Sequence, residues 1–194
     1  MLYYIAKFLL FFYFIIVRRV KIEGKENIPQ HGPVLLYANH PSAWDMFLMA
    51  AFSRRKIHYM AKAELFQNAI LRFLLKSVGA FPVSRGKGDV GSVKTVFKLL
   101  EQGKVVGVFP EGTRTPKKDL KKRKAGAAMM ALHSKAPILP VGVEWNKKVF
   151  SRVRVVFGEP FLMLPNNENK HIAKEELKIL TEEIMDKIYA LIGQ

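Results

Sequence analysis

Short apolar runs alternate with amphipathic segments along most of the chain, a pattern typical of proteins that mix strands and helices. The clearest apolar run covers residues 34–38 (Val-Leu-Leu-Tyr-Ala), with Gly32 and Pro33 before it and Pro41 soon after it. A continuous apolar run between turn formers predicts a strand that is buried on both faces. Other runs predict further strands at residues 19–23, 57–61, 79–83, 105–109, 137–143 and 152–157.

The segments between these runs repeat their apolar residues with the spacing of a helix. They predict helices at about residues 44–53, 64–76, 91–102 and 125–134. A carboxyl-terminal stripe predicts one more, which covers the core, through Ala173, Leu177, Leu180, Ile184, Ile188 and Leu191. We therefore expect an α/β fold: a single domain with a mostly parallel central sheet flanked by helices. The broad apolar face of residues 64–76 suits packing on that core or contact with lipid.

The amino terminus is the most apolar part of the chain. From Leu2 to Val17 only Lys7 is charged, and basic residues follow at positions 18, 19 and 21. As a helix this stretch spans about 24 Å, less than the roughly 30 Å of a bilayer's hydrocarbon core. We expect residues 1–18 to form an N-terminal membrane-anchoring helix that inserts in part, with one domain over residues 19–194. The basic residues favour a cytoplasmic position for that domain. The alternative is a helix buried in the core.

The chain is strongly basic, with 32 Lys and Arg against 16 Asp and Glu, a formal net charge of +16. This charge favours an anionic partner: nucleic acid, an anionic lipid surface, a phosphorylated substrate or an acidic carrier protein. Composition does not choose among them. The absence of cysteine excludes disulfides, thiolate metal sites and thiol nucleophiles.

A histidine and an aspartate five positions apart, His40 and Asp45, follow the predicted strand at residues 34–38. They should lie at the carboxyl end of that strand, the edge at which α/β sheets bind ligands. A neutral imidazole can accept a proton near neutral pH, and a carboxylate on its other nitrogen fixes its tautomer. The segment holds no nucleophile beside the histidine, so the pair suits a reaction in which a substrate supplies the attacking group. The same residues also fit a strand-to-helix turn in which Ser42 or Asp45 caps the next helix.

Residues 86–91 (Gly-Lys-Gly-Asp-Val-Gly) formally match the glycine pattern of dinucleotide-binding proteins. That pattern requires the first strand of a βαβ unit before it and an acidic residue about twenty positions later. Neither condition holds, so we interpret the segment as a loop in which Asp89 caps the next helix. No metal is expected, because the remaining histidines lack the spacing of metal ligands: His31, His58, His133 and His171.

Four short blocks occur in order along the chain, and a fifth lies between the first two. They are residues 39–45 (Asn-His-Pro-Ser-Ala-Trp-Asp), 61–66 (Ala-Lys-Ala-Glu-Leu-Phe), 79–85 (Gly-Ala-Phe-Pro-Val-Ser-Arg), 109–115 (Phe-Pro-Glu-Gly-Thr-Arg-Thr) and 138–143 (Ile-Leu-Pro-Val-Gly-Val). Together they resemble the glycerolipid acyltransferases with the HxxxxD motif, specifically the bacterial type of 1-acyl-sn-glycerol-3-phosphate (lysophosphatidate) acyltransferase. The resemblance spans about residues 20 to 160.

The resemblance implies roles for individual residues. His40 corresponds to the family's general base, which deprotonates the acceptor hydroxyl, and Asp45 to the carboxylate that orients it. Pro140 belongs to a block associated with the acyl donor or with shaping the site. The positions associated with binding the glycerol phosphate of the acceptor are Lys62, Arg85, Glu111, Gly112, Thr113, Arg114 and Lys124. Arg123 departs from the family pattern, since an aromatic residue is more usual there.

The chemistry of these residues agrees with the implied roles. A phosphomonoester needs about two cations, best of all a forked guanidinium, and Arg85 and Arg114 each follow a predicted strand. Glu111 either orients Arg114 or bonds a glycerol hydroxyl. Residues 117–124 hold six basic side chains and suit a solvated or lipid-facing loop as well as a catalytic one.

The reaction implied by the resemblance is transfer of an acyl group to the sn-2 hydroxyl of 1-acylglycerol 3-phosphate, which gives phosphatidate for phospholipid synthesis. The donor is acyl-CoA or acyl-acyl carrier protein, and no other cofactor is expected. A thioester is already activated, so direct attack needs no acyl-enzyme, and the chain has neither a cysteine nor a Gly-x-Ser-x-Gly turn. The expected location is the cytoplasmic face of the cell membrane.

Two alternative functions are also compatible with the sequence. The same chemistry suits glycerol 3-phosphate, another lysophospholipid or an acylated sugar lipid as the acceptor. A non-enzymatic basic protein that binds anionic membranes or nucleic acid would also account for the charge. Nucleic acid is the less favoured partner, because the aromatic residues cluster at the amino terminus rather than among the basic residues.

Overall fold

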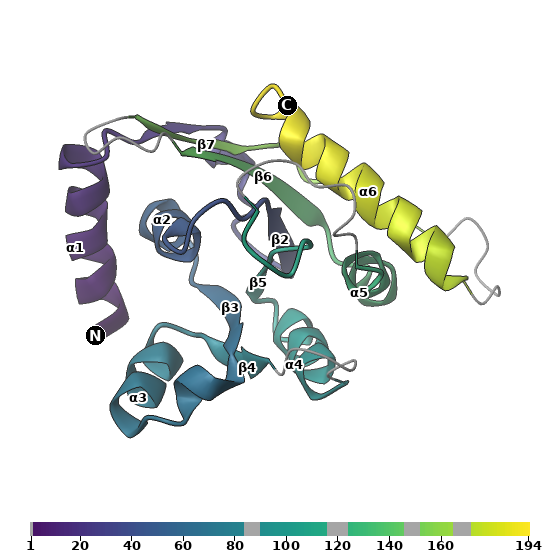
Figure 1. Ribbon diagram of the computed structural model, residues 1–194, viewed down its shortest axis with the longest axis horizontal. Coiled ribbons are helices and arrows are strands. Elements are labelled where there is room, and N and C mark those ends of the chain that lie inside the picture. Colours follow the sequence, from purple (N-terminus) through teal and green to yellow (C-terminus); the bar gives the residue numbers. More distant parts are fainter. Residues whose placement is uncertain (1, 84–89, 116–123, 146–151, 165–171) are drawn as a thin grey trace.

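In the described part of the chain, seven strands form one sheet with helices on both faces (Figure 1). This computed structural model describes residues 2–83, 90–115, 124–145, 152–164 and 172–194. The strands are β1 (Lys21–Glu23), β2 (Val34–Ala38), β3 (Ile57–Lys62), β4 (Phe81–Val83), β5 (Val105–Val108), β6 (Ile138–Trp145) and β7 (Val153–Phe157). Their order is β1-β7-β6-β2-β5-β3-β4, and every neighbouring pair is parallel except β6 and β7. The predicted α/β fold with a mostly parallel sheet is confirmed.

The apolar run of β2 is explained by its central position, between β5 and β6. Successive side chains of a strand point to opposite faces of the sheet. Val34, Leu36 and Ala38 enter the core on one face, and Leu35 and Tyr37 enter the core on the other. Because both faces are covered, every residue of β2 is buried, which accounts for the continuous apolar run.

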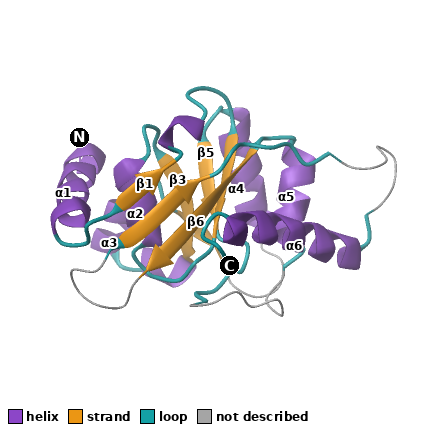
Figure 2. Cartoon of the chain, turned by 90° about the horizontal axis from the view of Figure 1, so that it is seen from above, coloured by secondary structure: helices purple, strands orange, loops and turns teal. Residues whose placement is uncertain are grey.

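The helices divide between these two cores. On one face lie α1 (Leu2–Ile16) and α2 (Asp45–Phe52), whose buried residues include Phe14 and Leu48. On the other face lie α4 (Val90–Glu101), α5 (Gly126–Ser134) and α6 (Lys174–Ala190). Figure 2 shows the strands between these two layers. The predicted covering role of the carboxyl-terminal stripe is confirmed, since Ile184 and Ile188 are fully buried.

The predicted single helix over residues 64–76 is wrong. The segment forms a short 3₁₀ helix, η2 (Ala63–Phe66), and then α3 (Ala69–Ser77). Asn68 separates them, because its extended backbone ends the first helix and its side chain accepts a hydrogen bond from Leu71 N, 3.0 Å away. This is the usual way in which an asparagine begins a helix. No residue of α3 is buried.

The amino-terminal helix α1 packs along α2 but leaves much of its surface exposed. Phe14 is fully buried, and Lys7 donates a hydrogen bond to the carbonyl of Ser53 at the end of α2. Large apolar side chains on its outer face are exposed at Tyr4, Ile5, Phe8, Leu9, Phe12, Tyr13, Ile15 and Ile16. Among the described residues, no helix is both long and apolar enough to cross a membrane. The anchoring role of residues 1–18 stays a prediction.

Candidate active site

The carboxyl ends of β2, β5 and β6 meet at one edge of the sheet. β2 is parallel to both of its neighbours, so the carboxyl ends of these three strands lie together. The Asn39 amide fixes the loop after β2 against β6: it donates to Val143 O at 2.8 Å and accepts from Val143 N at 2.7 Å. This pair of bonds extends the strand pairing by one residue and sets the position of His40.

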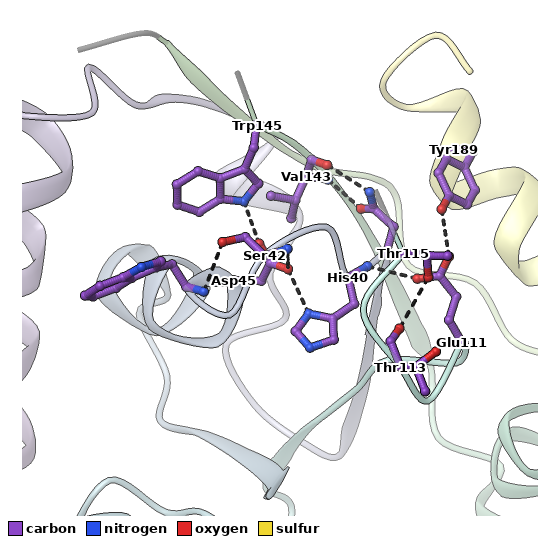
Figure 3. Close-up of polar contacts among 11 residues, drawn as sticks. His40, Ser42, Asp45, Glu111, Thr113, Thr115, Val143, Trp145 and Tyr189 are labelled. Atoms are coloured by element: carbon purple, nitrogen blue, oxygen red, sulfur yellow. Dashed lines mark hydrogen bonds and ion pairs between the residues drawn. The ribbon is translucent and has the colours of Figure 1, made fainter. Parts of the chain in front are cut away.

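His40 and Asp45 form the pair predicted from the sequence (Figure 3). The Nδ1 atom of His40 lies 2.8 Å from Asp45 Oδ2, and both residues are buried. Because a carboxylate can only accept a hydrogen bond, we assign the ring proton to Nδ1. The neutral ring then presents the lone pair of Nε2, on the opposite edge, as a base.

Three donors hold the Asp45 carboxylate in place. Besides His40, the backbone N–H of Ser42 donates to Oδ2 at 2.9 Å, and the indole N–H of Trp145 donates to Oδ1 at 2.5 Å. Burial raises the pKa of Asp45 above its ordinary value, and the hydrogen bonds oppose that shift. Asp45 begins α2 but makes no side-chain cap to it, so its carboxylate serves the histidine and the loop instead.

An aromatic stack fixes the plane of the imidazole. The ring of Phe109, just after β5, lies 3.9 Å from the His40 ring, centroid to centroid, at an angle of 16°. Tyr59 of β3 stacks next to Phe109, with centroids 6.2 Å apart. Gly107 makes room for this stack, because a Cβ atom there would lie 2.3 Å from the Tyr59 ring. The ring therefore has little freedom to turn away from Asp45.

The segment 109–115 holds the backbone of His40. Glu111 Oε2 accepts a hydrogen bond from His40 N at 3.0 Å, and Thr115 N donates to His40 O at 2.8 Å. The other carboxylate oxygen of Glu111 accepts from the hydroxyl of Tyr189, on α6, at 2.7 Å. Both oxygens are thus engaged within the protein, and the side chain is buried. A direct part for Glu111 in binding the acceptor stays a prediction.

The rest of this segment lies beside the histidine. Gly112 has a left-handed backbone, with φ of 67°, and a Cβ atom there would lie 2.5 Å from Lys124 Nζ. The predicted residue Lys124 therefore reaches the same turn. Thr113 Oγ1 is buried without a hydrogen-bond partner among the described residues, and Arg114 is exposed. A part for these groups in binding the acceptor stays a prediction.

The other predicted site residues have different settings. Lys62 ends β3 and forms an exposed ion pair with Glu64, at 3.1 Å. Pro140 is buried within β6 opposite Tyr37, and its carbonyl accepts a hydrogen bond from Gly158 N. Arg85 and residues 117–123 lie outside the described residues. Among the residues that are described, no group of three or more His, Asp or Glu side chains could hold a metal ion.

Sequence reasoning gave no role to Trp145, Tyr189 or Phe109. Trp145 is 100 residues away in sequence from its partner Asp45, and Tyr189 is 78 residues away from its partner Glu111. Phe109 lay in a recognised block, and its place directly after a strand could have indicated a contact with the histidine. Nothing local distinguishes Trp145 or Tyr189 from other core aromatic residues, because only the folded sheet brings them to the site.

Removing the Tyr189 hydroxyl is expected to destabilise the fold. The Tyr189→Phe change leaves a buried carboxylate oxygen of Glu111 without this donor, which costs about 1–3 kcal/mol of unfolding free energy. Urea denaturation of wild type and variant measures the difference. Tyr13→Phe, an exposed position, is the control and should be neutral within about 0.5 kcal/mol. A Tyr189→Phe protein as stable as wild type would show that the bond contributes nothing.

An imidazole held by an aspartate at the carboxyl edge of an α/β sheet is an arrangement typical of enzymes that use a histidine as a general base. The family model described as Acyltransferase matches residues 19–144. The chain belongs to this acyltransferase family.

Individual proteins that this chain resembles carry names that agree with this family. A 1-acyl-sn-glycerol-3-phosphate acyltransferase of Bacillus subtilis (strain 168) is 36% identical over 179 residues, which cover 89% of this chain and 87% of the relative. A protein of the same name from Streptococcus pneumoniae is 34% identical over 143 residues, 70% of this chain and 53% of the relative. The crystal structure of the 1-acyl-sn-glycerophosphate (LPA) acyltransferase PlsC from Thermotoga maritima has the same fold. Its TM-score is 0.70 at 24% identity, and the match covers 100% of this chain and 79% of that one.

Proposed function

We propose that the enzyme transfers an acyl group from acyl-CoA or acyl-acyl carrier protein to the sn-2 hydroxyl of 1-acylglycerol 3-phosphate, giving phosphatidate. The observation that carries this proposal is the His40–Asp45 pair, held at the sheet edge against the turn that contains Arg114. The names of the relatives, at 36% identity over most of both chains, support the choice of acceptor.

His40 is the general base of the proposed reaction. Its Nε2 accepts the proton of the sn-2 hydroxyl while the oxygen of that hydroxyl attacks the carbonyl carbon of the thioester. Asp45 keeps the ring in the required tautomer and stabilises the imidazolium that forms. The stacking of Phe109 holds the ring plane during the transfer.

The tetrahedral intermediate then collapses. Backbone N–H groups near the start of α2 stabilise its oxyanion. The carbon–sulfur bond breaks, and the leaving thiolate takes the proton from His40, which restores the free base. The products are phosphatidate and the free thiol of coenzyme A or of the carrier protein. No covalent acyl-enzyme is needed, because the donor is already a thioester.

Basic residues hold the phosphate of the acceptor in this proposal. Lys124 reaches the turn that holds Arg114 and Thr113, and the buried hydroxyl of Thr113 can donate to a phosphate oxygen. Arg85 and Lys62 complete the set, and Lys62 exchanges its exposed partner Glu64 for the ligand. Two or more cations around one phosphomonoester favour it over a neutral head group.

The lipid acceptor places the enzyme at the cytoplasmic face of the cell membrane, anchored through residues 1–18. The exposed apolar face of α1 supports this location. Its fifteen residues suit insertion into one leaflet rather than a full span.

The proposal is tested with the purified full chain in detergent. Lysophosphatidate is supplied with acyl-CoA or acyl-acyl carrier protein, and phosphatidate is measured by mass spectrometry. Phospholipase A2 then reports whether the new acyl group is at sn-2. Glycerol 3-phosphate and lysophosphatidylcholine are offered in parallel. Higher turnover on either of them than on lysophosphatidate would contradict the proposed acceptor.

A further inference from the structure

The helix α3 is an exposed apolar helix with few contacts to the rest of the protein. Ile70 and Phe73 are 74% and 66% exposed, and Leu71 and Leu74 are also exposed. Only Leu75 reaches inward, to a small cluster around Phe66. Ile70, Phe73 and Leu74 have the spacing of one helix face. A soluble monomer rarely leaves such a group of side chains in water.

The charges on α3 are all of one sign. It carries Arg72 and Lys76, both exposed, and no acidic residue. An apolar face with basic residues beside it is the composition of helices that lie in the interface of an anionic bilayer. A second protein chain would require no such excess of positive charge.

Lys56 joins α3 to the first turn of α1. Its ammonium donates to Ser77 O, at the end of α3, at 3.1 Å, and it lies 5.2 Å from the centroid of the Tyr3 ring. Figure 1 shows α3 beside the amino-terminal end of α1. Exposed apolar residues of the two helices therefore belong to neighbouring parts of the structure.

We propose that α3 is a second membrane-binding element, which enters the interface of an anionic bilayer together with α1. This inference rests on the proposed lipid substrate and extends it: two separated contacts fix the orientation of the protein on the membrane, whereas one helix alone would let it rotate. The basic residues Arg72 and Lys76 give the preference for anionic lipid.

Flotation with vesicles of phosphatidylglycerol and phosphatidylcholine tests this proposal. The double variant Ile70→Ser/Phe73→Ser is expected to bind these vesicles at least about tenfold more weakly than wild type. The variant Arg72→Gln/Lys76→Gln should lose the preference for phosphatidylglycerol over pure phosphatidylcholine. Ile179→Ser removes an exposed apolar side chain from α6 and is expected to bind like wild type.

Wild-type vesicle binding by the α3 double variant overturns the proposal. If that variant also loses an oligomer in light scattering, α3 is instead an interface between copies of the chain. Flotation uses no acyl donor, so failure of the proposed transferase reaction would not alter this test.

An independent observation concerns Trp145, which links α1 to the catalytic pair. Its indole N–H donates to Asp45 Oδ1 at 2.5 Å. The other parts of the indole contact the amino-terminal region: Phe14 lies 6.4 Å away, edge to face, and the Arg18 guanidinium lies 4.8 Å from the ring centroid. The carboxylate that orients His40 is thus one side chain away from α1.

We infer that Trp145 is a positioning residue, which holds Asp45 in register with His40 and is itself held by α1. Without the indole N–H, Oδ1 of Asp45 loses the one donor that it has among the described residues, and the carboxylate can rotate away from His40. Among the described residues, four charged or titratable groups lie near the contact between Trp145 and Asp45. They are His40, Tyr59, Arg18 and, through the backbone of His40, Glu111.

The test is Trp145→Phe, which keeps an aromatic ring against Phe14 and removes the N–H. Its kcat is expected to fall about tenfold with KM for both substrates within about twofold. The acid limb of its pH–rate profile should move to higher pH, because an anion that loses a donor takes up a proton more readily. Trp44→Phe, which also contacts α1 but makes no bond to the Asp45 carboxylate, is the matched control.

A spectroscopic readout separates this inference from the transferase activity. The chain has two tryptophans, so its ¹⁵N-labelled form gives two indole N–H signals, and Trp44→Phe assigns them. The Trp145 signal should lie downfield and move upfield in Asp45→Asn. An unchanged Trp145 signal in Asp45→Asn, or an unchanged pH–rate profile in Trp145→Phe, would overturn the positioning role.

Discussion

Replacing His40 by alanine is expected to lower kcat for phosphatidate formation by about 10²- to 10⁴-fold. The change removes the general base of the proposed reaction, while the cationic turn that we propose binds phosphate remains. KM for lysophosphatidate should therefore change much less than kcat. Turnover is measured in the detergent assay, with mass spectrometry for the product, and vesicle flotation should give wild-type binding.

The matched control is His133→Ala. His133 is exposed on α5, and its Nδ1 donates a hydrogen bond to Met129 O in the same helix. Its loss should leave turnover within about twofold of wild type. Imidazole added to His40→Ala is expected to restore part of the rate, because the gap beside Phe109 has the shape of the missing ring. A His40→Ala enzyme with more than a tenth of wild-type turnover would remove the base from the mechanism.

Strands could be predicted well from the sequence because local pattern and burial agree in this fold. The run at residues 34–38 is apolar at every position, and β2 is buried on both faces. The proline in residues 79–83 indicated an edge strand, and β4 is indeed the last strand of the sheet. In the first case burial on both faces requires an apolar run, and in the second the edge position permits a proline.

Residues 64–76 show where local pattern misleads. The apolar spacing continued across Asn68, so periodicity alone predicted one helix. The asparagine gains more by capping α3 than by continuing η2, and its bond to Leu71 N starts the helix afresh. The apolar spacing also says nothing about what covers the face, and in the structure α3 is left uncovered.

At the site, the pair His40 and Asp45 could be predicted because both residues lie within one short stretch of sequence. The setting of Glu111 could not. Its two partners are the backbone of His40 and the hydroxyl of Tyr189, which lie 71 and 78 residues away in the chain. Sequence reasoning offered Arg114 or a glycerol hydroxyl as partners, since a carboxylate next to an arginine usually forms an ion pair. Only the packing of α6 against the sheet supplies the tyrosine.

Replacing Asp45 by asparagine is expected to lower kcat by about 10³- to 10⁴-fold while the fold is kept. The amide oxygen can still accept from Trp145, which turns the amide nitrogen toward His40 Nδ1. A donor at that position forces the ring proton onto Nε2, so the nitrogen that faces the acceptor is no longer a base. Turnover in the detergent assay measures the loss, and Asp45→Glu, which keeps the charge, should lose less.

Thermal unfolding separates this effect from damage to the fold. Burial raises the pKa of Asp45, and such a group stabilises the folded state fully below its unfolded pKa of about 4. That contribution is lost as the pH rises through the folded pKa, because the buried carboxylate must then carry its charge. Asparagine does not titrate, so the melting temperature of Asp45→Asn relative to wild type is expected to increase from pH 4 to pH 7. A variant that melts far below wild type at pH 7, or one that keeps a tenth of the turnover, would show that Asp45 holds the loop rather than the tautomer of His40.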